Sequence, residues 1–137
     1  MPKIRGDIRY EPEEGDWIFY VHSTGFSYPL TSWSISVSHE REVQSEYDNS
    51  HNDEIISRQT QLSESDYFEL ENLFGKLKQL SPEILANVAQ VDGLPTDTFY
   101  IDGLKIRGNF WDGDKIKQDL LSQVIKILLK AANIEES

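Results

Sequence analysis

One β-hairpin signal constrains the fold of this chain more than any other segment. Two strand-like runs, TFYI (98–101) and LKIRGNFW (104–111), are separated only by an Asp-Gly pair. Such a pair between two strand-like runs favours a two-residue turn, and this turn fixes which residues of the two strands lie opposite each other. In that register Phe99 faces Ile106 on one side of the ribbon. The sequence therefore predicts an antiparallel strand pair near the C-terminus.

Four earlier segments have the composition or the two-residue alternation of strands. They are residues 4–10, 17–23, 33–43 and 55–62. The third run alternates most regularly, and the side chains on one of its faces are Trp33, Ile35, Val37, His39, Arg41 and Val43. Residues 44–54 contain turn formers and charges without a period, which indicates a mobile surface loop. The simplest arrangement of the four strands is an antiparallel meander.

Three later segments carry helix signals. Ser63 is expected to cap the first helix, and Pro82 begins a second, shorter one that continues to about Gln90. The last helix is expected from about 113 to 132, with Asp112 as its N-cap. Its predicted apolar face comprises Ile116, Leu120, Val124, Ile127, Leu128 and Ala131.

The order of these elements, β-β-β-β-α-(α)-β-β-α, predicts an α+β fold in which helices pack on one face of an antiparallel sheet. A chain of 137 residues can bury about two-thirds of its unfolded surface around one core. We therefore expect a single domain over residues 1–137.

The chain contains no cysteine, which excludes disulfides, thiolate metal ligands and a cysteine nucleophile. Its first residues, MPKIRGDIRYEPEEGD, include no apolar signal segment. No apolar run approaches the roughly 18 residues that a membrane span needs. We expect a soluble, cytoplasmic protein that does not contact a membrane.

The net charge of −11 is unevenly distributed. Residues 1–70 hold 14 acidic and 5 basic side chains, whereas residues 71–137 hold 10 and 8. An acidic surface repels the phosphates of nucleic acids and attracts a cationic partner. The charge therefore predicts a basic protein partner and no nucleic acid, although solubility alone also accounts for such a charge.

Motifs of several enzyme classes are absent from the sequence. It has no Gly-x-Ser-x-Gly elbow, no phosphate-binding loop that ends in Gly-Lys-Ser/Thr, and no glycine-rich turn of the dinucleotide-binding type. We expect no catalytic residue, no metal ligand and no cofactor. An alternative is a small hydrolase or metal-dependent enzyme that uses His22 and His39 with a carboxylate, which requires the two imidazoles to meet in a cleft.

The densest run of acidic residues is the first candidate surface for a basic partner. It comprises Glu40, Glu42, Glu46, Asp48, Asp53 and Glu54. The segment lacks the glycine and the flanking helices of an EF-hand, so a calcium site is not expected. The alternative role of these residues is a solvated loop whose charge protects strand edges from pairing.

The second face of the predicted hairpin is a further candidate surface. It comprises Tyr100, Lys105, Arg107 and Trp111. Aromatic and cationic side chains are common in the parts of interfaces that contribute most to binding. Alternatively, the cationic stems pack beside the aromatic rings under a neighbouring helix.

The C-terminal pattern is a strand, an Asp-Gly turn, a strand ending in tryptophan, and a helix rich in Leu, Ile and Lys. This segment, FYIDGLKIRGNFWDGDKIKQDLLSQVIKILLKAA, resembles the small bacterial immunity proteins of polymorphic or contact-dependent toxin systems. The resemblance covers about the last 35 residues and implies an acidic cytoplasmic protein that binds and blocks a cognate toxin, often a cationic nuclease. It implies no particular contact residues, because these differ between the families.

Three functional hypotheses follow. The preferred one is a non-enzymatic binding or inhibitor protein whose acidic N-terminal half meets a basic partner. The second is the histidine-dependent enzyme. The third is a domain that binds a small ligand between sheet and helices, which requires an open apolar pocket that the well-filled helix stripes do not favour.

Overall fold

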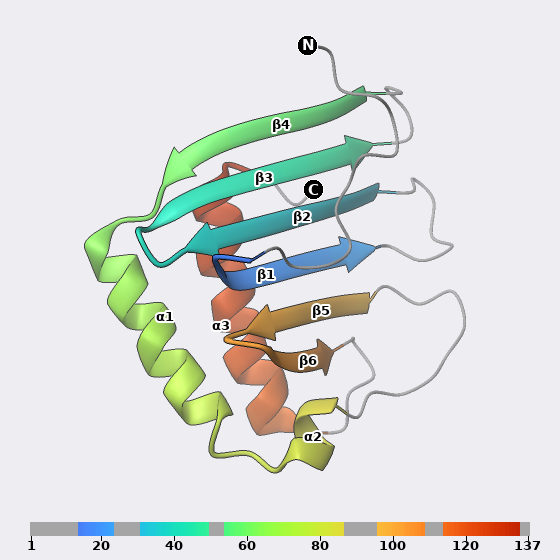
Figure 1. Ribbon diagram of the computed structural model, residues 1–137. Coiled ribbons are helices and arrows are strands. Elements are labelled where there is room, and N and C mark those ends of the chain that lie inside the picture. The colour runs from blue at the N-terminus through green and yellow to red at the C-terminus, as the bar shows by residue number, and fades with distance from the viewer. Residues whose placement is uncertain (1–13, 24–30, 50–53, 87–95, 109–113, 135–137) are drawn as a thin grey trace.

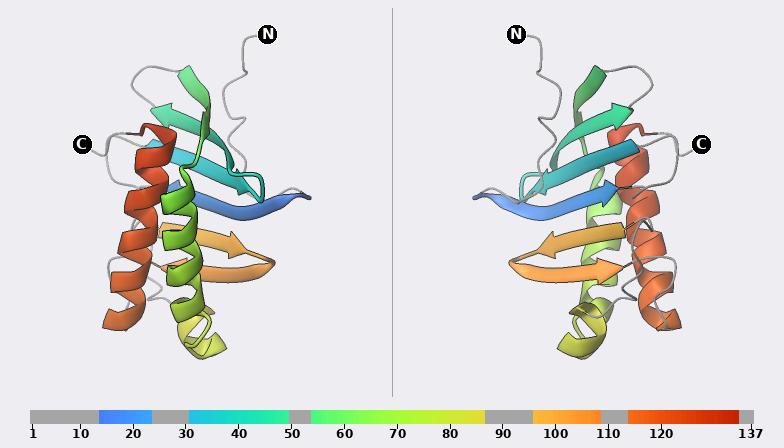
Figure 2. Two further views of the ribbon diagram at one scale, coloured as in Figure 1. Left: turned by 90° about the vertical axis from the view of Figure 1, so that its left-hand side faces the viewer. Right: turned by 90° about the vertical axis from the view of Figure 1, so that its right-hand side faces the viewer.

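A six-stranded antiparallel sheet carries α1 and α3 on one of its faces (Figures 1 and 2). The computed structural model describes residues 14–23, 31–49, 54–86, 96–108 and 114–134. The strands are β1 (Asp16–Ser23), β2 (Thr31–Ser38), β3 (Glu42–Asn49), β4 (Glu54–Gln61), β5 (Thr96–Ile101) and β6 (Leu104–Gly108). The helices are α1 (Glu64–Leu77), α2 (Pro82–Ala86) and α3 (Lys115–Ala132). The predicted α+β class and the predicted order of elements are confirmed.

Strand β1 lies inside the sheet, whose strand order is β4-β3-β2-β1-β5-β6. It pairs with β2 on one side and with β5 on the other. Ile18 and Tyr20 point into the core beneath the helices, and neither is exposed. Phe19, between them, points to the opposite face because side chains alternate along a strand, and it is also buried. The expectation that residues 17–23 form a deeply placed strand is confirmed.

The prediction of one strand over residues 33–43 was wrong, because a turn divides this run into β2 and β3. Val43 lies directly opposite Val37 and therefore shares its face. The alternation of apolar residues consequently continues through the turn and hides it in the sequence. The prediction of a mobile loop over 44–54 was also wrong, since β3 continues to Asn49 and β4 begins at Glu54.

Several predicted features lie outside the described residues. These are the strand over 4–10, the end of the second helical piece, and residues Trp111 and Asp112. The four-stranded antiparallel meander is present, but it consists of β1 to β4 and does not depend on the N-terminal run.

The predicted hairpin is confirmed as β5 and β6. Asp102 and Gly103 have φ angles of 49° and 83°, which are the positive values that a two-residue hairpin turn requires. Phe99 pairs with Ile106 as expected. At the other end of the hairpin, a Cβ on Gly108 would lie 2.9 Å from Leu121 Cδ1. The missing side chain therefore lets β6 approach α3 closely.

Helix α3 begins two residues later than predicted. Its N-cap is Asp114, not Asp112, and the Asp114 carboxylate accepts the Lys117 N–H over 2.8 Å. The start of the buried face also differs, because Ile116 is 64% exposed and Lys117 is buried. Within the described part of the chain, no helix has the length and apolar character needed to cross a membrane.

Ordinary capping interactions are present at the start of α1 and at the end of α3. The Ser63 hydroxyl accepts the Asp66 N–H at the start of α1, so the predicted cap is confirmed. Helix α3 ends at Asn133, which adopts the left-handed conformation with φ 57°. The next residue, Ile134, donates its N–H to the Leu129 carbonyl and is buried. This turn brings the chain back beneath the sheet after α3.

Two glycine-to-alanine substitutions should change stability in opposite directions. Gly103→Ala forces a side chain onto a positive φ and should lower the free energy of unfolding by about 1 kcal/mol or more. Gly75→Ala lies in the exposed part of α1, where an added Cβ meets nothing within 4 Å. It should raise the free energy of unfolding by about 0.5–1 kcal/mol. Urea unfolding measures both, and a loss of stability in Gly75→Ala would contradict this account of the helix.

Candidate functional site

A tight turn between β2 and β3 holds two of the predicted acidic residues at one end of the sheet. The Arg41 N–H donates to the Ser38 carbonyl oxygen over 3.0 Å, and Arg41 has a positive φ of 67°. The Ser38 hydroxyl accepts the N–H groups of both Glu40 and Glu42 over 3.2 Å. The turn thus fixes the backbone of both glutamates, while their side chains are exposed.

These two glutamates line an acidic groove of about 260 Å³. We call it the acidic groove; its carboxylates belong to Glu14, Asp16, Glu40 and Glu42. Ser36, Gln44 and Gln59 also line it, and they lie on the sheet face opposite the helices. None of the described residues that line the groove is basic. Several carboxylates in one concave surface focus a negative potential there.

The carboxylates of the acidic groove do not form a metal-ligand cluster. Among the described residues, no three His, Cys, Asp or Glu side chains are grouped as ligands of a metal ion.

Of the remaining residues of the predicted acidic run, Glu46 does not line this groove. Glu46 lies in the middle of β3 and is only 3% exposed, so a partner cannot reach it without rearrangement. Asp48 and Glu54 occupy the far ends of their strands, and their side chains lie outside the described part, as does the whole of Asp53. The five of these residues whose backbone the structure describes are thus divided among the β2–β3 turn, β3 and the start of β4, and are not gathered on one surface loop.

The second predicted surface lies on the same sheet face, at the other edge. Lys105 Nζ stands 5.6 Å from the centre of the Tyr100 ring, and this ring lies 6.1 Å from that of Phe19. Lys105 is exposed, whereas Tyr100 and Arg107 are half-buried. The expected cation–π contact is present, but helices α1 and α3 pack on the opposite face (Figure 2). Three to four strand spacings, about 14–19 Å, separate this surface from β3.

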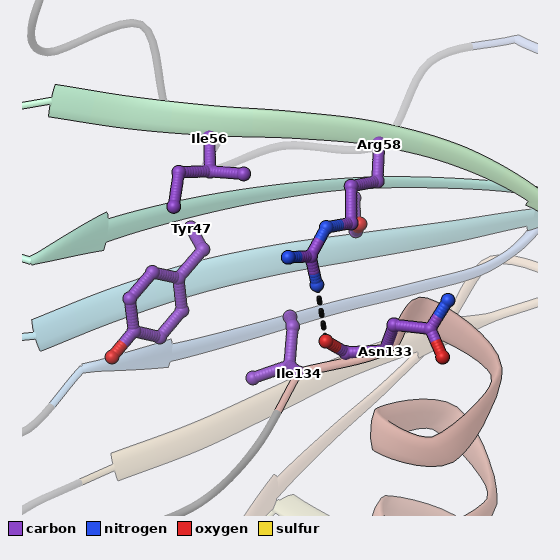
Figure 3. Close-up of a pocket in the computed structure, with 6 residues that line it drawn as sticks. Tyr47, Ile56, Arg58, Asn133 and Ile134 are labelled. Atoms are coloured by element: carbon purple, nitrogen blue, oxygen red, sulfur yellow. Dashed lines mark hydrogen bonds between the residues drawn. The ribbon is translucent and has the colours of Figure 1, made fainter.

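A larger hollow lies on the helix side of the sheet, between β3, β4 and the end of α3 (Figure 3). Its volume is about 710 Å³, and its lining residues are Ser45, Tyr47, Ile56, Arg58, Asn133 and Ile134. The Arg58 guanidinium donates to the Asn133 carbonyl oxygen, where the partial negative charge of α3 is located. This lining is mixed polar and apolar, unlike the apolar pocket that the small-ligand hypothesis requires.

The two histidines of the enzyme hypothesis lie at opposite ends of the sheet. His39, in the β2–β3 turn, is 61% exposed, and its ring is 5.9 Å from that of Trp17. His22 is five residues further along β1 than Trp17, a distance of about 17 Å. The convergence that the hypothesis required is therefore absent for this pair.

His22 instead belongs to a polar cluster that sequence reasoning missed. His22 Nδ1 and the Tyr20 hydroxyl both lie 2.6 Å from Asp97 Oδ1. The His22 ring also stacks on Trp33 with centres 4.2 Å apart. Asp97 carries no recognisable motif, and only the pairing of β1 with β5 brings it beside His22. The cluster fastens the end of β5 to the sheet.

No protein-family model matches the chain, and no curated protein matches it in sequence.

A double-mutant cycle should show that the histidines act independently. His22→Ala should lower the free energy of unfolding by about 1–3 kcal/mol, because it leaves Asp97 without its imidazole partner. His39→Ala should change it by less than about 0.5 kcal/mol. The double variant should equal the sum within about 0.5 kcal/mol in urea unfolding.

The pair Tyr20→Phe and Asp97→Asn is the positive control, because these side chains share a hydrogen bond and should not be additive. A coupling between the two histidines as large as that of the control pair would contradict their separation.

Proposed function

We propose that the chain is a non-enzymatic binding protein that recognises a basic protein partner through the acidic groove. One observation supports this most directly: four carboxylates line one groove on the sheet face opposite the helices, and the described lining contains no basic side chain. The N-terminal half also holds 14 acidic and 5 basic residues, an excess that adds to the negative potential of the protein.

The physical basis of recognition is electrostatic complementarity. Charges on an open surface contribute little to affinity one by one, but together they steer an oppositely charged protein and set its orientation. Such steering weakens as salt rises, because the screening length falls to about 8 Å at physiological ionic strength. A partner held by the groove should therefore associate fastest at low salt.

The resemblance of the C-terminal pattern to immunity proteins adds a biological role to this proposal. In that role the partner is a cationic toxin, and the chain blocks it by occupying its basic surface. The protein would work in the cytoplasm, where such toxins act. The expectation of a non-enzymatic role accords with a fold in which His22 and His39 lie far apart.

Charge-neutralising substitutions test the groove. Glu40→Gln with Glu42→Gln removes two carboxylates from the groove, whereas Glu69→Gln with Glu71→Gln removes two from the exposed side of α1. With each protein as bait at low salt, the parent chain and the α1 variant should capture the same basic protein. The groove variant should lose it, and its association rate constant should fall by about tenfold.

Equal loss in the two variants would assign the effect to net charge alone, against the groove. Recovery of no basic protein at low salt would contradict the proposed function. For the immunity role, expression of the captured protein should stop bacterial growth, and co-expression of the chain should restore it. A coding region for a toxin beside that of the chain would be expected as well.

A further inference from the structure

We infer that the outer edge of β4 is the docking site for an extended segment of the basic partner, which adds to the sheet as a further strand. The charge assigned to that segment rests on the proposed function. The edge itself is a separate observation, because it follows from the pairing of the strands and not from the charges.

Strand β4 lacks several of the devices that usually protect a sheet edge. Edges are commonly blunted by short strands, charged side chains, proline, bulges or a covering segment. Strand β4 contains two charged residues, Glu54 and Arg58, but the Arg58 guanidinium donates to the Asn133 carbonyl oxygen on the helix face. Strand β4 has eight residues and no proline, and every one of its positions pairs with β3 in unbroken register. In the part of the chain that the structure describes, no strand lies beyond it. The opposite edge, β6, has five residues and contacts α2.

The phase of the hydrogen-bond ladder shows which groups β4 presents outward. The Leu62 N–H donates to the Arg41 carbonyl over 2.8 Å, one step beyond the Glu42–Gln61 pair. Bonded and non-bonded pairs alternate in an antiparallel ladder, so the even-numbered residues of β4 bond to β3. The N–H and C=O groups of Ser57 and Gln59 therefore point away from the sheet. They are the groups that an added strand would pair with.

The two faces beside this edge differ in charge, and this difference determines the occupant. On the face opposite the helices, Gln59 lines the acidic groove and Glu42 is paired with the end of β4. On the helix face, Ile56 is 41% exposed and Arg58 lines the mixed hollow (Figure 3).

An added strand lies about 4.8 Å from β4 and sends alternate side chains to the two faces. Basic side chains suit the first face, and apolar side chains suit the second. The occupant is thus an extended segment in which basic and apolar residues alternate.

Two peptides of equal composition test this inference. One is an octapeptide of alternating lysine and valine with capped termini, and the other, also capped, has four lysines followed by four valines. Their charge and apolar content are the same, but only the first can present lysine to one face and valine to the other. We expect the alternating peptide to bind about tenfold more tightly in fluorescence anisotropy. Equal affinities would overturn the inference.

Ser57→Pro removes an outward N–H from β4 without removing a bond to β3, and Ser57→Thr is its matched control. The proline variant should bind the alternating peptide no more tightly than it binds the peptide of four lysines followed by four valines. Amide exchange of Ser57 and Gln59 in the unmodified protein should slow by about tenfold when the alternating peptide is present. If the proline variant does not fold, a peptide N-methylated on alternate residues, which cannot pair, replaces it.

The possible failures are distinguishable. In one outcome both peptides bind with equal affinity, Ser57→Pro does not change their binding, and Glu40→Gln with Glu42→Gln abolishes it. That result would support the acidic groove as the binding site and overturn the inference about the β4 edge. If an alternating glutamate–valine peptide binds as well as the lysine one, the basic occupant is wrong. If the free protein forms a dimer that Ser57→Pro abolishes, the edge serves a second copy, which also overturns the inference.

Discussion

The pairing of β1 with two neighbours is the constraint on which the rest of the structure depends. Without it, the meander β1–β4 and the hairpin β5–β6 would be separate sheets. We call the pairing of β1 with β5 the joint. Across it, the Tyr20 and Phe99 rings stack with centres 4.6 Å apart, and Asp97 binds both Tyr20 and His22. The apolar surface of both parts is thereby merged into one layer that α1 and α3 cover.

This joint also places the two candidate surfaces on one face. The acidic groove lies towards β3, and the Tyr100–Lys105 pair lies on β5 and β6. Because the helices occupy the other side, the two surfaces face the same direction. The face thus carries negative charge at one end and positive charge at the other, which favours one orientation of a docked protein over its reverse.

The parts of the fold that sequence could predict are those decided by neighbouring residues. The Asp102-Gly103 turn, the Ser63 cap and the apolar stripe of α3 depend on local chemistry, and all three are present. The β2–β3 turn was missed because it contains no Gly, Pro or Asn, and Arg41 instead supplies the positive φ. The prediction of Ile116 on the buried face failed because the start of α3 turns this residue towards solvent.

The candidate site could also be predicted only in part from the sequence. Glu40 and Glu42 were predicted from charge density, and the groove that contains them also needed Glu14 and Asp16, which come from another part of the chain. The burial of Glu46 had no local signal, because whether a carboxylate on a strand is exposed depends on the packing around that face. The β4 edge could not be predicted either, since strand order is a property of the whole sheet.

The pairing of β1 with β5 also matters during synthesis of the chain, because it forms late. Paired residues of β1 and β5 lie as far as 83 positions apart, as Ile18 and Ile101 do, whereas each strand of the meander pairs with the next one in sequence. While β5 is still unmade, the nascent chain can complete β1–β4 but has no strand to cover the side of β1 that later pairs with β5. An apolar strand with one open side readily pairs with another chain. The C-terminal hairpin therefore covers the side of β1 that the meander alone leaves open to another chain.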